Sequence, residues 1–124
     1  NVTINSGALK NCNNTKNVKT GRNLRVLGEI FQNSNVEEAT VESLSTVGSS
    51  AFNSVGKALH GDIVINEGVT TIENTAFKGC SNIPSVTIPD TVTDIGASAF
   101  YECTNLKKAK LPKEIKKIEW RSIL

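Results

Sequence analysis

The 124-residue chain lacks methionine, has one histidine and three prolines, and carries only six aromatic residues. No apolar run approaches the roughly 18 residues that cross a bilayer, and no signal-peptide pattern opens the chain, so we predict no membrane insertion. Because the chain begins at Asn1 and every nascent chain begins with methionine, we expect a fragment or a processed product of a longer protein.

Small polar and branched apolar residues are abundant instead. Asn, Ser and Thr are the commonest polar residues, and Val, Ile, Leu and Phe together make up more than a quarter of the chain. An apolar share of this size excludes wholesale disorder, and the length favours one core. We therefore predict a single, turn-rich domain over residues 1–124.

Charge is segregated along the chain. Residues 1–25 carry a net charge of +5, residues 26–106 carry −8 and residues 107–124 carry +5, for a total of +2. Nucleic-acid binding depends on many phosphate contacts from one basic surface, which a total near zero does not favour. We predict no nucleic-acid partner.

The sequence repeats at a nearly constant period. The segment VTIPDTVTDIGASAF at 86–100 recurs as IVINEGVTTIENTAF at 63–77, so that Phe100 and Phe77 hold equivalent positions. The repeats predict five coils of 21–25 residues over 18–124, preceded by an irregular partial coil at 1–17. One aromatic position per coil is held in turn by Leu9, Phe31, Phe52, Phe77, Phe100 and Ile123.

An alternating apolar pair in each coil predicts a short strand with these two side chains pointing inward. The pairs are Val18 and Thr20, Ala39 and Val41, Ile63 and Ile65, Val86 and Ile88, and Ala109 and Leu111. Parallel strands of neighbouring coils would stack about 4.8 Å apart, with the phenylalanine rings one above another in the core. Where the chain turns back, Gly28, Gly48 and Gly96 are the positions at which a tight return could use positive φ.

The succession CSNIPSVTIPDTVTDIGASAF at 80–100, followed by CTNLKKAKLP at 103–112, resembles the leucine-rich repeat of BspA-like, treponemal-type surface proteins. The resemblance covers residues 18–124 and is most specific over 59–112. It implies a right-handed leucine-rich-repeat solenoid, with short parallel strands on a concave face and irregular or 3₁₀ segments on a convex face. It also implies an extracellular or cell-surface location in a bacterium, and a role in adhesion or host interaction.

The outward positions of the predicted strands are the candidate binding residues. One row consists of Lys19, Thr40, Val64, Thr87 and Lys110, and the row beside it consists of Asn17, Glu38, Asp62, Ser85 and Lys108. These rows predict a broad, shallow contact surface, without a deep pocket, for a protein or glycan ligand. The alternative is that the same side chains only hydrate the sheet.

Motifs for catalysis and cofactor binding are missing from the sequence. It contains no G-x-S-x-G, phosphate loop, dinucleotide fingerprint, H-E-x-x-H or EF-hand spacing. His60 lies in the longest coil, with Asp62 as its only nearby carboxylate candidate, and we interpret it as an exposed residue of an insertion. We predict a non-catalytic protein without a cofactor or a metal.

Each of the three cysteines, Cys12, Cys80 and Cys103, lies three residues after an aromatic position. An odd number excludes complete internal disulfide pairing. We interpret Cys80 and Cys103 as reduced core thiols, because parallel inward side chains do not point at each other as a disulfide requires. The alternatives are a disulfide between these two residues, or a metal site without C-x-x-C spacing.

Taken together, the sequence favours a protein- or glycan-binding module, and the alternative is a structural spacer that projects another domain from the cell surface. The last predicted coil places Ile115, Ile118 and Ile123 in inward columns with no following coil to cover them. We therefore expect the protein to continue beyond Leu124, or to make an end-to-end contact there with Trp120 as the candidate lid.

Overall fold

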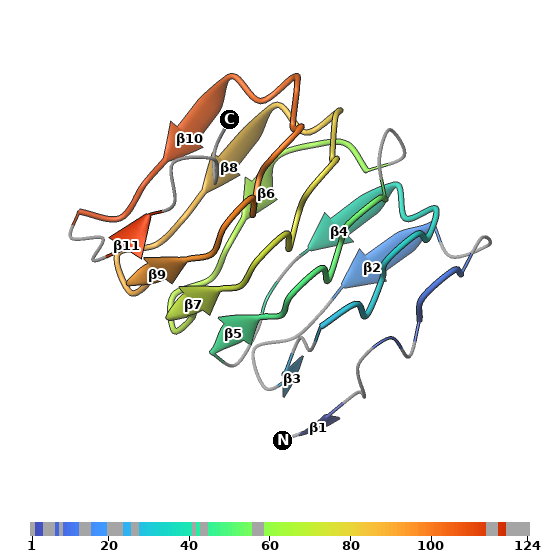
Figure 1. The fold of residues 1–124 in the computed structure, drawn as a ribbon, viewed down its shortest axis with the longest axis horizontal. Coiled ribbons are helices and arrows are strands. Elements are labelled where there is room, and N and C mark those ends of the chain that lie inside the picture. The colour runs from blue at the N-terminus through green and yellow to red at the C-terminus, as the bar shows by residue number, and fades with distance from the viewer. Residues whose placement is uncertain are drawn as a thin grey trace.

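The computed structural model describes residues 2–3, 7, 9–12, 16–19, 24–25, 28–40, 42, 45–55, 59–113 and 117–118. Within these residues the chain forms short parallel strands and no helix. The strands are β1 (Val2–Thr3), β2 (Asn17–Lys19), β3 (Leu24–Arg25), β4 (Glu38–Thr40), β5 (Thr46–Val47), β6 (Ile63–Val64), β7 (Thr71–Ile72), β8 (Ser85–Thr87), β9 (Asp94–Ile95), β10 (Lys108–Lys110) and β11 (Lys117–Ile118). Figure 1 shows them in two rows, the even-numbered strands in one and the odd-numbered strands in the other.

The even-numbered row contains the strands that the alternating pairs predict, and it is broken once. β2 pairs with β4, so that Val18 lies opposite Ala39, and β8 pairs with both β6 and β10, so that Val86 lies between Ile63 and Ala109. β4 and β6 belong to separate sheets. The row therefore consists of a two-stranded and a three-stranded segment.

The odd-numbered row adds a second strand to each coil, where the sequence predicted only one. β5, β7, β9 and β11 form one sheet in which Val47, Ile72, Ile95 and Ile118 lie in register, and β1 pairs with β3. Strands of two residues are too short to show an alternating pattern, which is why the sequence did not reveal them. The pairing of β1 with β3 confirms that the partial coil at the N-terminus joins the stack.

A series of tight turns carries the aromatic residue of each coil. The N–H groups of Phe31, Phe52 and Phe77 donate to carbonyl oxygens of the next coil at 2.8, 2.7 and 2.8 Å. The N–H of Leu9 donates to the next coil in the same way at 3.0 Å, which confirms its predicted position. We call this part of the molecule, comprising residues 28–34, 48–55, 73–80 and 96–103, the turn side.

The turn side contains no 3₁₀ helix among the described residues, contrary to one part of the expectation. Ser50 and Ser54 on either side of Phe52 have φ of 59° and 62°, and Ser98 and Glu102 flank Phe100 with 57° and 62°. A 3₁₀ helix requires negative φ at every residue, so these left-handed residues produce successive separate turns.

The expectation that glycines supply the positive φ was wrong at Gly28, Gly48 and Gly96. In the turn that follows Gly96 the left-handed residue is Ser98. A methyl group on Gly96 would lie 2.5 Å from the backbone nitrogen of Asn74 and 2.7 Å from the carbonyl carbon of Glu73. Gly96 is therefore needed because two coils approach closely at this point, and not for its range of φ.

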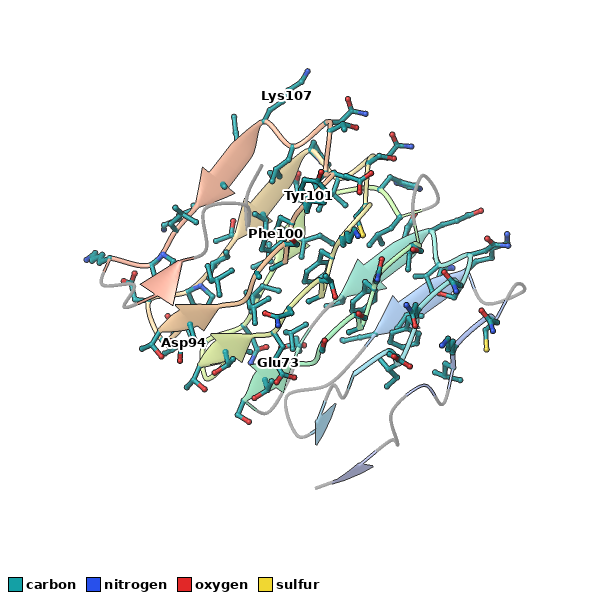
Figure 2. All side chains as sticks on the ribbon, in the orientation of Figure 1. Glu73, Asp94, Phe100, Tyr101 and Lys107 are labelled. Carbon is teal, nitrogen blue, oxygen red and sulfur yellow. The ribbon has the colours of Figure 1, made fainter. Side chains whose placement is uncertain are left out.

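The phenylalanine rings form the centre of the core, as predicted. The centroids of Phe31, Phe52, Phe77 and Phe100 follow one another at 5.1, 5.2 and 5.3 Å. Phe52, Phe77 and Phe100 are among the largest fully buried side chains. Figure 2 shows Phe100 inside the stack, whereas Lys107, Glu73 and Asp94 project away from it.

The predicted inward pairs are buried in the middle of the stack but not at β10. Ile63, Ile65, Val86 and Ile88 are all at most 2% exposed. Ala109 and Leu111 are exposed, which corrects the prediction, because β10 is the edge strand of its sheet. Thr20, Val41, Ile115, Ile123 and Trp120 lie outside the described residues, as do the side chains of Ala39 and Ile118.

Candidate functional site

The strand register brings the candidate binding residues onto one surface, which we call the strand face. Lys19 lies opposite Thr40, and Thr87 lies between Val64 and Lys110. In the neighbouring row, Ser85 lies opposite Lys108, and the Ser85 hydroxyl donates to Asp62 Oδ1 at 2.7 Å. Both rows are therefore continuous within each segment and are interrupted between β4 and β6.

Val64 is the apolar centre of the strand face. Its exposure of 59% is the largest for a bulky hydrophobic residue in the described part of the chain. Its neighbours Ile63 and Ile65 are buried, so the alternation of the strand turns this one side chain out to solvent.

One extra residue lies at the interruption of the row. Buried Leu59 precedes Ile63, the first residue of β6, by four positions, whereas buried Val36 precedes Ala39 on β4 by three. The N–H of His60 still donates to the carbonyl of Glu37 at 3.0 Å, so the additional residue is Gly61. Gly61 has a φ of 92°, and a methyl group there would meet no atom within 4 Å. Gly61 is therefore the residue that lengthens the spacing at the point where β4 and β6 belong to separate sheets.

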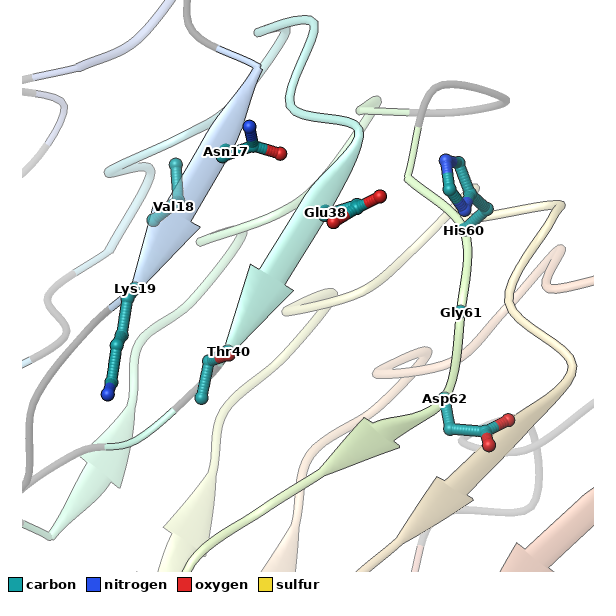
Figure 3. Close-up of a pocket in the computed structure, with 8 residues that line it drawn as sticks. All are labelled: Asn17, Val18, Lys19, Glu38, Thr40, His60, Gly61 and Asp62. Carbon is teal, nitrogen blue, oxygen red and sulfur yellow. The ribbon is translucent and has the colours of Figure 1, made fainter.

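A hollow of about 510 Å³ opens at the interruption, and we call it the break hollow. Figure 3 shows its lining residues: Asn17, Val18, Lys19, Glu38, Thr40, His60, Gly61 and Asp62. Five of them, Asn17, Lys19, Glu38, Thr40 and Asp62, are candidates from the sequence. Gly61 is the residue that sequence reasoning missed, and the spacing between Leu59 and Ile63 is the signal that could have found it.

A second hollow of about 330 Å³, the valine hollow, lies on the other segment of the strand face. Its lining residues are Val64, Ile65, Asn66, Glu67, Thr87, Ile88, Pro89, Asp90 and Lys110. Three of these, Val64, Thr87 and Lys110, are candidates from the sequence. The two remaining candidates, Ser85 and Lys108, are on the same face but line neither hollow.

A third hollow, of about 680 Å³, lies on the odd-numbered strands and was not anticipated. Glu73 and Asn74 line it, and both side chains already bridge coils. Glu73 Oε1 accepts the N–H of Ser49 at 3.2 Å, and Asn74 Oδ1 accepts the N–H of Ala97 at 2.8 Å. These contacts give the two side chains a structural role in the stack.

Cys80 and Cys103 are buried free thiols, which confirms their interpretation as reduced core residues. The Cys80 thiol donates to the carbonyl of Phe52 at 3.4 Å, and the Cys103 thiol donates to that of Phe77 at 3.2 Å. Burial raises the pKa of the Cys103 thiol to about 11, although a backbone hydrogen bond from Cys80 acts in the opposite direction. The disulfide alternative was wrong because each thiol is directed at the carbonyl of the preceding coil.

His60 is exposed, as predicted, and it lines the break hollow together with Asp62. A catalytic histidine would need a nucleophile and an orienting partner converging on one reacting atom. In the described part of the chain, no three His, Cys, Asp or Glu residues gather closely enough to hold a metal ion.

A profile of the BspA-type leucine-rich repeat region matches the chain in six copies, over residues 1–58 and 59–122. The chain belongs to the BspA-type leucine-rich repeat family. No curated protein and no solved structure matches the chain.

Members of the BspA-type family share general properties that concern function. Leucine-rich repeat proteins of this kind are generally non-catalytic and act as repeat-built binding modules, typically at bacterial surfaces. None of the described residues belongs to a helix long and apolar enough to span a bilayer.

Proposed function

We propose that this BspA-type chain is a non-catalytic module that binds a protein or a glycan, within a secreted or surface-attached bacterial protein used for adhesion or host interaction. The observation that carries the proposal is the strand face, where Val64 is 59% exposed between rows of polar side chains. An apolar centre with a polar rim is typical of protein contact surfaces. Nucleic acid is not among the proposed partners.

The proposal extends to the shape of the stack. Coils of 21–25 residues, with strands on one side and tight turns on the other, suit a right-handed solenoid whose strand face is concave. A concave row of short strands offers an extended area to a ligand, and solenoid proteins commonly bind through such surfaces. The open hollows on this face would then be subsites of one broad surface.

The alternative function is a structural spacer, and the turn side favours it. The ring column and the hydrogen bonds between coils continue without a break from Phe31 to Phe100. Such a column keeps successive coils at a constant spacing, which is what a spacer needs. A spacer would have no ligand for the strand face.

The test replaces Thr40, Val64 and Thr87 together with Glu and measures capture of mucosal proteins and glycans on an array. We expect at least a tenfold loss of capture, because the substitutions remove the apolar centre and place three bulkier, charged side chains on the contact surface. A control replaces Thr70, Thr93 and Thr104 with Glu, which adds the same charge away from the strand face and should leave capture unchanged.

The outcomes separate the two functions. Capture that survives the strand-face substitutions would exclude the strand face as the binding surface. If the unmodified chain captures neither proteins nor glycans, the spacer function is favoured.

An end-to-end contact at the last coil is a further part of the proposal. β10 is the edge of its sheet, and Leu111 beside it is 39% exposed. Exposed edge strands readily pair with other chains. We expect sedimentation of the chain to show self-association that Leu111→Lys reduces, and a strict monomer at all concentrations would contradict this contact.

A further inference from the structure

The two hollows of the strand face differ in chemistry. The break hollow is flanked by the carboxylates of Glu38 on β4 and Asp62 at the start of β6. The valine hollow has Val64 and the ring of Pro89 among its lining residues. The strand β6 lies between the two hollows. Asp62, which lines the break hollow, precedes β6, and Val64, which lines the valine hollow, ends it.

The break hollow favours a cationic group. Asp62 accepts the Ser85 hydroxyl at Oδ1, which orients the carboxylate and leaves acceptor sites for a second donor. Lys19 lies on the far side of the hollow, on β2, and Lys16 forms an ion pair with Glu37 at 3.5 Å. Gly61 has no side chain to close the entrance between the two carboxylates. Charge complementarity therefore points to a basic side chain in this hollow.

The spacing of the hollows matches an extended peptide. The break hollow is lined from β2, β4 and the residues before β6, and the valine hollow is lined from the ends of β6, β8 and β10. With neighbouring strands about 4.8 Å apart, the hollow centres, near β4 and β8, are at least about 10 Å apart. In an extended chain, side chains four residues apart point the same way and are about 13 Å apart. A basic side chain and an aliphatic side chain at such positions would reach both hollows at once.

We propose that the strand face binds an extended polypeptide segment in which a Lys or Arg, seated in the break hollow, lies four residues from an aliphatic residue seated in the valine hollow. This inference rests on the proposed binding function and narrows the ligand to a polypeptide. None of the ten residues in the two rows is aromatic. Aromatic rings are the usual platforms for the apolar faces of sugars, so this surface favours a peptide over a glycan.

The experiment selects binders from a phage-displayed library of random heptapeptides on the immobilised chain. Before each round, peptides that bind a variant with both Glu38→Lys and Val64→Asp are removed, so that ligands of the two hollows remain. We expect enriched peptides to carry Lys or Arg four positions from Val, Ile or Leu. One enriched peptide is then synthesised and titrated against the chain.

Single substitutions test each hollow with that peptide. Glu38→Lys should weaken binding at least tenfold by repelling the basic side chain, and Val64→Asp should do the same at the valine hollow. Asp94→Lys makes the same kind of charge reversal on the odd-numbered strands and should change binding less than twofold. Circular dichroism of each variant verifies that the fold is retained.

Three results would overturn the inference, and they differ in whether the proposed binding function is retained. Enrichment of peptides without the basic and aliphatic pair would overturn it and retain the binding function. Absence of enriched peptides together with glycan capture that depends on the strand face would also overturn it and retain the binding function. Absence of any ligand for the strand face would overturn both.

Discussion

The turn side and the strand face respond differently to the same irregularity in coil length. The coil from Phe52 to Phe77 is the longest of the stack, yet the two rings stack at 5.2 Å with an interplanar angle of 1°. On the strand face the same coil carries Gly61, and the row of strands breaks between β4 and β6. The comparison shows that the turn side determines how the coils stack. The additional residue Gly61 lies instead just before β6, where it lines the break hollow.

The physical difference lies in how each side is held together. On the turn side, large rings pack at 5.1–5.3 Å and backbone N–H groups bond to the next coil, so a displaced residue would leave both a void and unpaired donors. On the strand face the outward side chains are exposed to water, which can form hydrogen bonds with their polar groups in any position. An insertion is therefore tolerated much better on the strand face.

The largest effect should come from removing a ring. Phe77→Ala should lower the free energy of unfolding by about 3–5 kcal/mol, because a fully buried ring leaves a cavity between two coils. The irregular coil length suggests a smaller loss for Phe52→Ala, but Phe52 is equally buried between two rings, so we expect a similar loss. Unfolding in guanidinium measures both losses. A much smaller loss for either variant would show that the rings contribute unequally to stability, despite their regular spacing.

An alkaline titration tests the thiol of the turn side. The pKa of Cys103 is about 11 in the folded chain and 9.0 in the absence of burial, so the unfolded chain loses this proton first as pH rises. The buried thiol stabilises the fold fully below pH 9, and this stabilisation is lost as the pH rises from 9 to 11, a decrease of roughly 3 kcal/mol. Unfolding is measured at pH 8 and above pH 11.

Cys103→Ser is the control for that titration. A hydroxyl does not ionise in this range, and Ser34 shows that serine is accepted at the equivalent position, where its hydroxyl donates to the Phe31 carbonyl at 2.6 Å. The variant should lose less stability than the natural chain between the two pH values. Equal losses would mean that Cys103 does not titrate differently in the folded chain.

The smallest effect on stability should come from deleting Gly61. The deletion restores the spacing of three residues between Leu59 and the first residue of β6, so β4 and β6 should pair and the break hollow should close. We expect the free energy of unfolding to change by less than about 1 kcal/mol, since a glycine contributes mainly flexibility to the unfolded chain. Hydrogen exchange should show slower exchange at the amides of Ile63 and Val64, and unchanged exchange there would contradict the role of Gly61.

Much of the stack could be predicted from the sequence because it depends on periodic burial. The column of Phe31, Phe52, Phe77 and Phe100 and the inward pairs of β6 and β8 follow directly from residues that recur at the coil period. Ala109 and Leu111 were predicted to point inward but are exposed. The sequence pattern does not show whether another strand packs beside β10. Asn74 escaped notice, and Gly96 was noted for the wrong reason, because their contact depends on the distance between two backbones.

The sequence by itself determined the family, the identity of most core residues and the rows of outward side chains, because each is a matter of period and hydrophobicity. Only the tertiary structure decided where the strand face breaks, which side chains surround the break hollow and to which carbonyls the buried thiols donate. These features depend on distances between neighbouring coils, and a single residue such as Gly61 changes them without altering the periodic pattern around it.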